Sequence, residues 1–285
     1  MLENISSILE SEYAKLLTRY NDSSSVSSAV KYVLSGEGKK IRPVLCLLSA
    51  ASLGGKMEDA IDAALAIEMI HTYSLVHDDL PCMDDDDMRR GRPTAHKKFD
   101  EATAVLAGDA LLTDAFSIIS EARNGLSFED KLRQVAILSR AAGGKGMVLG
   151  QSLDMENTGK GSFSKETLDA IHTAKTGALI GASLALGAAS AKKDEKTCED
   201  FYMAGLKIGL SFQILDDLLD ASSETGKTAG KDLEAGKLTY LAVMTKEKAK
   251  EAAEAATTEA LELISSYTNN SEFTTFILNL LDRKK

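Results

Sequence analysis

Apolar residues recur along most of this chain at the spacing of three and four that marks a helix with one buried face. In the first twenty residues they stand at Leu2, Ile5, Leu9, Tyr13, Leu16 and Leu17. The same spacing continues over 23–35, and glycines at 36 and 38 then end the helix. We find no run that alternates apolar and polar residues between turn signals, so strands are not expected. The pattern therefore predicts an all-α fold.

Later segments predict longer and more apolar helices. Pro43 suits an early helix position, and 44–53 after it is almost wholly apolar. Ser127 has the side chain of an N-cap residue. Further helices are expected over 58–80, 101–122, 127–142, 164–189, 194–220, 239–264 and 272–281. No linker-like composition divides them, so we expect a single domain over 1–285.

Charge and cysteine content narrow the setting of the protein. A net charge of −10 argues against a general affinity for nucleic acid, which needs a basic face. The cysteines, at 46, 82 and 198, are odd in number and lack metal-ligand spacing, which favours a reducing compartment. No run approaches the roughly 18 apolar residues of a membrane span, and 1–10 has no apolar signal core. We expect no membrane span and a cytoplasmic protein.

The most unusual segment is 77–91, which holds six aspartates within ten residues and then two arginines. An isolated acidic run is usually a solvated loop. Crowded carboxylates can instead share divalent cations, and arginine is suited to phosphate. Asp85, Asp86 and Asp87 read as a solvated tail, and Cys82 as a bystander.

A second acidic cluster changes that balance. Asp216 and Asp220 are four residues apart, so on a helix they lie about 40° from each other on one face. Asp78 and Asp84 are six apart and would diverge by about 120° on a regular helix. Pro81 interrupts the backbone hydrogen bonds between them, so a bulge can return Asp84 to the face of Asp78. Basic loops at 38–42, 89–92 and 227–237 complete a pattern that suits a diphosphate held through Mg²⁺.

At this point the sequence resembles the short-chain trans-isoprenyl diphosphate synthases, and most closely the bacterial farnesyl diphosphate synthases. The resemblance runs from Gly-Lys-Lys-Ile-Arg-Pro at 38–43 to Gly-Lys-Leu-Thr at 236–239. Between them lie the first acidic motif with a two-residue insertion, then Arg-Arg-Gly-Arg-Pro-Thr, Gly-Gln-x-x-Asp at 150–154, Lys-Thr-Gly at 175–177 and Phe-Gln-x-x-Asp-Asp-x-x-Asp at 212–220. The resemblance implies an isoprenoid synthase-type helical bundle around a deep central cavity, and a homodimer.

The resemblance also implies roles for individual residues. The metal ligands would be Asp78, Asp84, Asp216, Asp217 and Asp220, which together hold three Mg²⁺ per active site. The diphosphate of an allylic substrate would be contacted by Arg89, Lys175, Lys227 and Lys237. Isopentenyl diphosphate would be held by Gly38, Lys39, Arg42, His71 and Arg90. Thr176 and Gln213 would border the reacting carbons, with Lys175 and Arg89 also catalytic, and Gln151 and Asp154 would form the wall. Taken alone, His71 is more often a core histidine and Lys175 a surface lysine.

Product length should depend on the helix before the first acidic motif. In the resembled family an aromatic residue five positions before the motif, with the two-residue insertion, accompanies a C15 product. Tyr73 provides that bulk and Ser74 is small. Farnesyl diphosphate is therefore expected, with geranylgeranyl diphosphate as the alternative. A non-catalytic synthase subunit and a terpene cyclase are the rival functions, although both acidic motifs are complete and 38–42 suits a second diphosphate.

Overall fold

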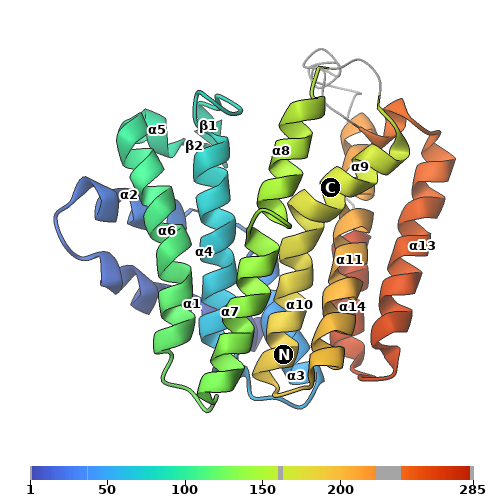
Figure 1. The fold of residues 1–285 in the computed structure, drawn as a ribbon, viewed down its shortest axis with the longest axis horizontal. Coiled ribbons are helices and arrows are strands. Elements are labelled where there is room, and N and C mark those ends of the chain that lie inside the picture. Colours follow the sequence, from blue (N-terminus) through green and yellow to red (C-terminus); the bar gives the residue numbers. More distant parts are fainter. Residues whose placement is uncertain (1, 37, 160–162, 223–238, 283–285) are drawn as a thin grey trace.

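The computed structural model describes residues 2–36, 38–159, 163–222 and 239–282. Helices make up nearly all of this part of the chain, and Figure 1 shows the long ones side by side. The α-helices are α1 (Leu2–Leu17), α2 (Ser25–Leu34), α3 (Ile41–Ser52), α4 (Ile61–Asp78), α5 (Ala95–Lys98), α6 (Glu101–Glu121), α7 (Phe128–Ala142), α8 (Met147–Asn157), α9 (Lys165–His172), α10 (Ala178–Ser190), α11 (Glu195–Ser222), α13 (Lys246–Ser265) and α14 (Ser271–Leu281). Short 3₁₀ turns lie at Thr18–Tyr20, Met57–Asp59 and Tyr240–Ala242. The predicted all-α class is confirmed.

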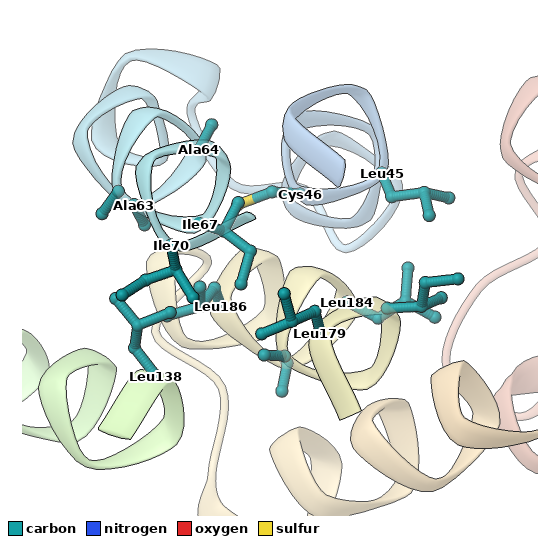
Figure 2. Close-up of a cluster of buried hydrophobic side chains, with 14 of the residues drawn as sticks. Leu45, Cys46, Ala63, Ala64, Ile67, Ile70, Leu138, Leu179, Leu184 and Leu186 are labelled. Atoms are coloured by element: carbon teal, nitrogen blue, oxygen red, sulfur yellow. The ribbon is translucent and has the colours of Figure 1, made fainter. Parts of the chain in front are cut away.

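The centre of the bundle is α10, in which every residue is buried. Figure 2 shows Leu179 and Leu184 of α10 near Leu45 of α3 and Ile67 of α4. Burial of one such side chain contributes about 1.5–3 kcal/mol, so this cluster is a main source of the fold's stability. Small residues let α11 come close: a Cβ on Gly205 would lie 2.4 Å from the Cα of Gly181. The small residues in this part of the sequence therefore serve close helix packing.

At α7, where a side chain caps the helix, the helix begins at the residue that the sequence predicts. Ser127 accepts a hydrogen bond from the backbone N–H of Asp130, and the Asp130 side chain accepts one from the N–H of Ser127. This capping box starts α7 at the predicted residue. The helix expected over 164–189 differs, because five residues, Thr173–Gly177 (η3), form a π-helix between α9 and α10. Such a widened turn has no signature in the apolar spacing.

The expectation of no strands is wrong in one short segment. β1 (Met88–Arg89) pairs antiparallel with β2 (Arg92–Pro93), at the upper end of α4 in Figure 1. Arg90 and Gly91 join them with φ of 51° and 74°. Positive φ at both central residues is the requirement of a tight hairpin turn. Two-residue strands are too short to show an alternating pattern, so the apolar periodicity could not reveal them.

Helix α6 bears on the expectation of no membrane span. Among the described residues it is the one helix long and apolar enough to cross a membrane, with a mean hydropathy of 1.5 in its most apolar window. The core helix of a soluble protein meets the same test, and α6 buries Ala107, Leu111 and Ala115 against its neighbours. The absence of a membrane span therefore stays a prediction.

Candidate active site

A cavity of about 1330 Å³ lies between α3, α4, α8, η3 and α11. That volume exceeds the range of about 300–1,000 Å³ usual for a single small ligand. Many residues predicted from the sequence line it: Gly38, Lys39, Arg42, His71, Tyr73, Ser74, Asp78, Arg89, Arg90, Gln151, Lys175, Thr176, Gln213 and Asp216. Segments far apart in the sequence therefore meet at one site with room for two substrates.

Other predicted residues are placed differently. Asp84, Asp217 and Asp220 are not among the residues that line the cavity. Asp154 also lies behind its surface, where it pairs with Lys175. Lys227 and Lys237 fall outside the described residues. The roles of these six residues remain predictions.

The first acidic stretch begins where α4 ends. After Asp78 the chain leaves the helix, and the backbone N–H of Asp84 donates to the carbonyl of Asp78 at 2.9 Å. The segment around Pro81 is thus a bulge that returns Asp84 to the end of α4. Burial raises the pKa of the Asp78 carboxyl to about 6, opposed by Lys175 and reinforced by Asp84. A cation beside these carboxylates would offset both burial and repulsion.

The next aspartate turns away from the cavity. Asp79 is buried, and its Oδ1 accepts from Arg89 Nε at 2.7 Å and lies 2.6 Å from Arg89 Nη2. Charge-assisted hydrogen bonds of this kind hold a guanidinium in one orientation. Asp79 therefore positions Arg89, a pairing across ten residues that the sequence pattern did not reveal.

Cations crowd the opposite wall. Arg42 is partly exposed, but its Nε is buried and has no hydrogen-bond partner within the protein. Burial lowers the pKa of the Arg42 guanidinium, and the nearby Glu68 carboxylate opposes that effect. Burial, then Arg42 and Arg90, hold the pKa of His71 well below its usual range, so His71 is neutral near pH 7. A guanidinium whose buried nitrogen lacks a partner and which lines a cavity suits an anionic ligand.

One charged residue on this wall, Glu68, was missed by sequence reasoning, and its partner Lys40 was predicted only as part of the basic loop 38–42. Lys40 Nζ lies 3.3 Å from Glu68 Oε1 and 4.8 Å from the centre of the Tyr13 ring. Lys40 starts α3 with a left-handed backbone, φ 45°. Glu68 could have been found, because it is the one acidic residue in the apolar run 63–70 of α4. It supplies negative charge beneath Lys40 and Arg42.

The π-helix η3 presents the third set of polar groups. Thr176 donates from Oγ1 to Gln213 Oε1 at 3.0 Å, and Lys175 Nζ donates to Asp154 Oδ2 at 2.6 Å. A Cβ on Gly150 would lie 2.1 Å from the backbone N of Lys175, so only glycine lets α8 approach this closely. The adjacent Gln151 has a buried Oε1 with no partner in the protein. Helices α8 and α11 therefore converge on Lys175 and Thr176.

In the second acidic cluster, as in the first, one aspartate lines the cavity and the next forms a hydrogen bond within the protein. Asp216 lines the cavity, while Asp217 Oδ2 accepts the backbone N–H of Tyr240 at 2.8 Å. The Tyr240 hydroxyl donates to Asp169 Oδ1, also at 2.8 Å. Asp217 thus ties the chain entering α13 to the end of α11.

The carboxylate side chains of the cavity are candidate ligands of a metal ion. Within the described ranges no three His, Cys, Asp or Glu side chains converge closely enough to hold an ion by themselves. Asp78 and Asp216 line one cavity from different helices, and burial, with a smaller contribution from Asp84, raises the pKa of Asp78. Oxygen donors of this kind fit Mg²⁺, which retains several non-protein ligands such as water and phosphate oxygens. The residues therefore fit a cation that arrives with an anionic ligand.

The rest of the cavity wall is apolar. Tyr73 is largely buried, and the Ser74 hydroxyl donates to the carbonyl of His71 at 2.9 Å, which leaves its side chain small toward the cavity. The apolar wall is formed by Leu75, Val105, Met147, Val148, Met155, Leu179 and Phe212. Such a wall suits a hydrocarbon chain and excludes water from reacting carbon.

Comparison with known proteins gives the family that this chain is similar to. The family model described as polyprenyl synthetase matches residues 23–277. The chain is 42% identical to the farnesyl diphosphate synthase of Micrococcus luteus, over 95% of this chain and 94% of that one. It is 45% identical to the chloroplastic geranylgeranyl pyrophosphate synthase of Capsicum annuum, over 85% of this chain and 66% of that one.

A solved structure shows the same fold with ligands. It is the geranyltransferase of Helicobacter pylori, complexed with magnesium and isoprenyl diphosphate. That chain superposes with a TM-score of 0.77 at 35% identity, over 96% of this chain and 95% of that one. The relatives thus include synthases named for products of two lengths.

Proposed function

We propose that this prenyltransferase, which belongs to the polyprenyl synthetase family, condenses isopentenyl diphosphate with an allylic diphosphate to give farnesyl diphosphate. One observation carries the proposal: two aspartate-bearing helix ends and a separate group of cationic residues, Lys39, Arg42 and Arg90, face the same cavity. The two substrates each carry a diphosphate, and the two parts of the cavity would bind these groups in different ways. One needs a cation to join it to carboxylates, and the other can bind arginine and lysine directly.

The allylic diphosphate is assigned to the acidic end. Arg89, which Asp79 holds in place, and Lys175 bind its oxygens. Asp78 and Asp216 hold Mg²⁺ there, with Asp84, Asp217 and Asp220 as further ligands and three ions in all. When bound, Mg²⁺ supplies Lewis-acid stabilisation of charge on the leaving group. Lys227 and Lys237 are proposed to add contacts to the same diphosphate.

Isopentenyl diphosphate is assigned to the cationic wall. Lys39, Arg42 and Arg90 neutralise it, and neutral His71 donates a hydrogen bond to it. Gly38 lies against the end of the Arg90 side chain, because a Cβ there would lie 2.5 Å from Arg90 Nη1 and would displace the guanidinium. The buried Nε of Arg42 gains a partner when this substrate binds.

The reaction follows from this placement. The allylic C–O bond breaks, and diphosphate leaves with the electron pair while Arg89 and Lys175 stabilise its growing charge. The hydroxyl of Thr176 and the amide of Gln213 place oxygen dipoles beside the carbocation. The isopentenyl double bond attacks that carbon, and the proton then lost passes to the released diphosphate. Apolar residues around the tail exclude water, which would otherwise capture the cation.

Product length rests on Tyr73, whose ring lies in the cavity wall below Asp78. We propose farnesyl diphosphate as the product, with geranylgeranyl diphosphate as the alternative, because the relatives are named for both. The apolar residues Leu106, Phe128 and Leu132 are exposed on α6 and α7 and support a homodimer. A single domain over 1–285 and a cytoplasmic location complete the proposal.

The decisive experiment incubates purified protein with Mg²⁺, geranyl diphosphate and isopentenyl diphosphate and measures released diphosphate and product length. Release that requires both substrates, with a C15 product, supports the proposal. Release from geranyl diphosphate alone indicates a cyclase, and no release indicates a non-catalytic subunit. Removal of Mg²⁺ with EDTA should abolish turnover, and added Mg²⁺ should restore it.

A further inference from the structure

His77 lies between the residue assigned to product length and the neighbouring helix. It is four residues after Tyr73 on α4, and the two rings meet edge to face with centroids 5.7 Å apart. Both rings line the cavity. Aromatic pairs in this geometry restrict each other's orientation. The position of the Tyr73 ring therefore depends on where His77 stands.

Two features of α6 hold His77 in place. Its Nε2 lies 3.1 Å from the carbonyl oxygen of Val105, and since a carbonyl only accepts, Nε2 carries the proton and donates. The ring edge also occupies the space left by the missing side chain of Gly108. A Cβ at that residue would lie 2.1 Å from His77 Nε2 and 2.5 Å from Cδ2. No side chain at 108 is compatible with the observed ring.

We propose that His77, docked on Gly108 and Val105 of α6, is a positioning residue that fixes Tyr73 and thereby limits the length of the prenyl product. The inference rests on the proposed function, because it assigns Tyr73 as the end of the cavity available to the growing chain. In this proposal helix α6, as well as α4, restricts the length of the product. The chain length is then set by the distance between α4 and α6 as well as by the size of residue 73.

Substitutions at the two helices should act in opposite directions. In His77→Ala the Tyr73 ring loses its support and can move into the vacated space, so products lengthen. In Gly108→Ala the methyl group displaces the His77 ring toward Tyr73 and the cavity, so the C10 fraction rises at the expense of C15. In the double variant the methyl group meets no imidazole, so the products follow His77→Ala. A change of about tenfold in the ratio of neighbouring lengths is expected, as for small changes of fit in apolar pockets.

The measurement is product length with excess isopentenyl diphosphate, the C5 allylic primer dimethylallyl diphosphate and Mg²⁺, so that C10, C15 and longer products are all counted. Tyr73→Ala is the matched control, and thermal melting shows folding. Wild-type product lengths from His77→Ala beside longer products from Tyr73→Ala would overturn the inference. Double-variant products that follow Gly108→Ala would also overturn it. If Gly108→Ala does not fold, the other three variants still decide the question.

The same experiment separates failure of the proposed function. Wild-type protein that makes no prenyl product contradicts the function itself. Wild-type protein that makes C20 contradicts only the farnesyl assignment, and the variants are then compared with that product. The inference itself fails when the ratio of product lengths does not change on substitution of His77 or Gly108.

Discussion

The two acidic clusters have the same proposed role in metal binding, but their backbone conformations differ. At the end of α4 the helix stops at Asp78 and a bulge follows, whereas α11 continues through Asp216 to Ser222. In each cluster the first aspartate lines the cavity and the next turns into the protein, because neighbours on a helix differ by about 100°. Asp79 holds the Arg89 side chain, and Asp217 holds the Tyr240 backbone. Adjacent carboxylates in such motifs therefore divide into one that faces substrate and one that supports.

The largest effect should come from the cavity-facing pair. Asp78→Asn and Asp216→Asn each remove a charge that the proposed reaction needs on opposite sides of the diphosphate. We expect kcat to fall roughly 10²–10³-fold in each, the loss typical of removing one group that stabilises the transition state. Steady-state rates at saturating Mg²⁺ test this. A strong loss in one variant alone would show that only one cluster serves the reaction.

A smaller and unequal effect is expected from the supporting pair. Asp79→Asn removes the charge paired with Arg89, so activity should fall about 10–100-fold, as for other groups that orient a site. Asp217→Asn retains an oxygen that can accept the Tyr240 N–H, so the loss should be only a few-fold. The measurement is kcat/KM for geranyl diphosphate. Equal losses would show that Asp217 is a principal metal ligand and not a minor one.

The smallest effect concerns stability without metal. The pKa of Asp78 is raised to about 6, so ionised Asp78 destabilises the folded state, and this cost appears as pH rises from about 4 through 6. In EDTA, Asp78→Asn should therefore be more stable than wild type at pH 8 by about 1–3 kcal/mol. The two should be equal near pH 3.5, where both side chains are neutral. Urea unfolding at both pH values tests this, and a variant no more stable at pH 8 would contradict the burial of Asp78.

Much of the site could be predicted because its chemistry is written in short motifs. Gly38, Asp78, Lys175 and Asp216 stand in segments whose composition is unusual for a helix, and all line the cavity. Glu68 was missed because one acidic residue in an apolar helix leaves no periodic signal. The η3 turn that presents Thr176 was missed because a π-helix requires no particular residue. The bulge after Asp78 could be inferred because proline cannot donate a backbone hydrogen bond.

The sequence by itself determined the helices, the two acidic clusters and the glycines that allow close approach. Those properties follow from local hydrogen bonding, apolar spacing and the absence of a side chain. Tertiary structure alone decided which partners meet: Asp79 with Arg89, Lys40 with Glu68, and His77 with Gly108. Each pairing except the first joins different helices, and all depend on how neighbouring segments pack. Local preferences do not contain that information, because the same helices could pack at other depths and rotations.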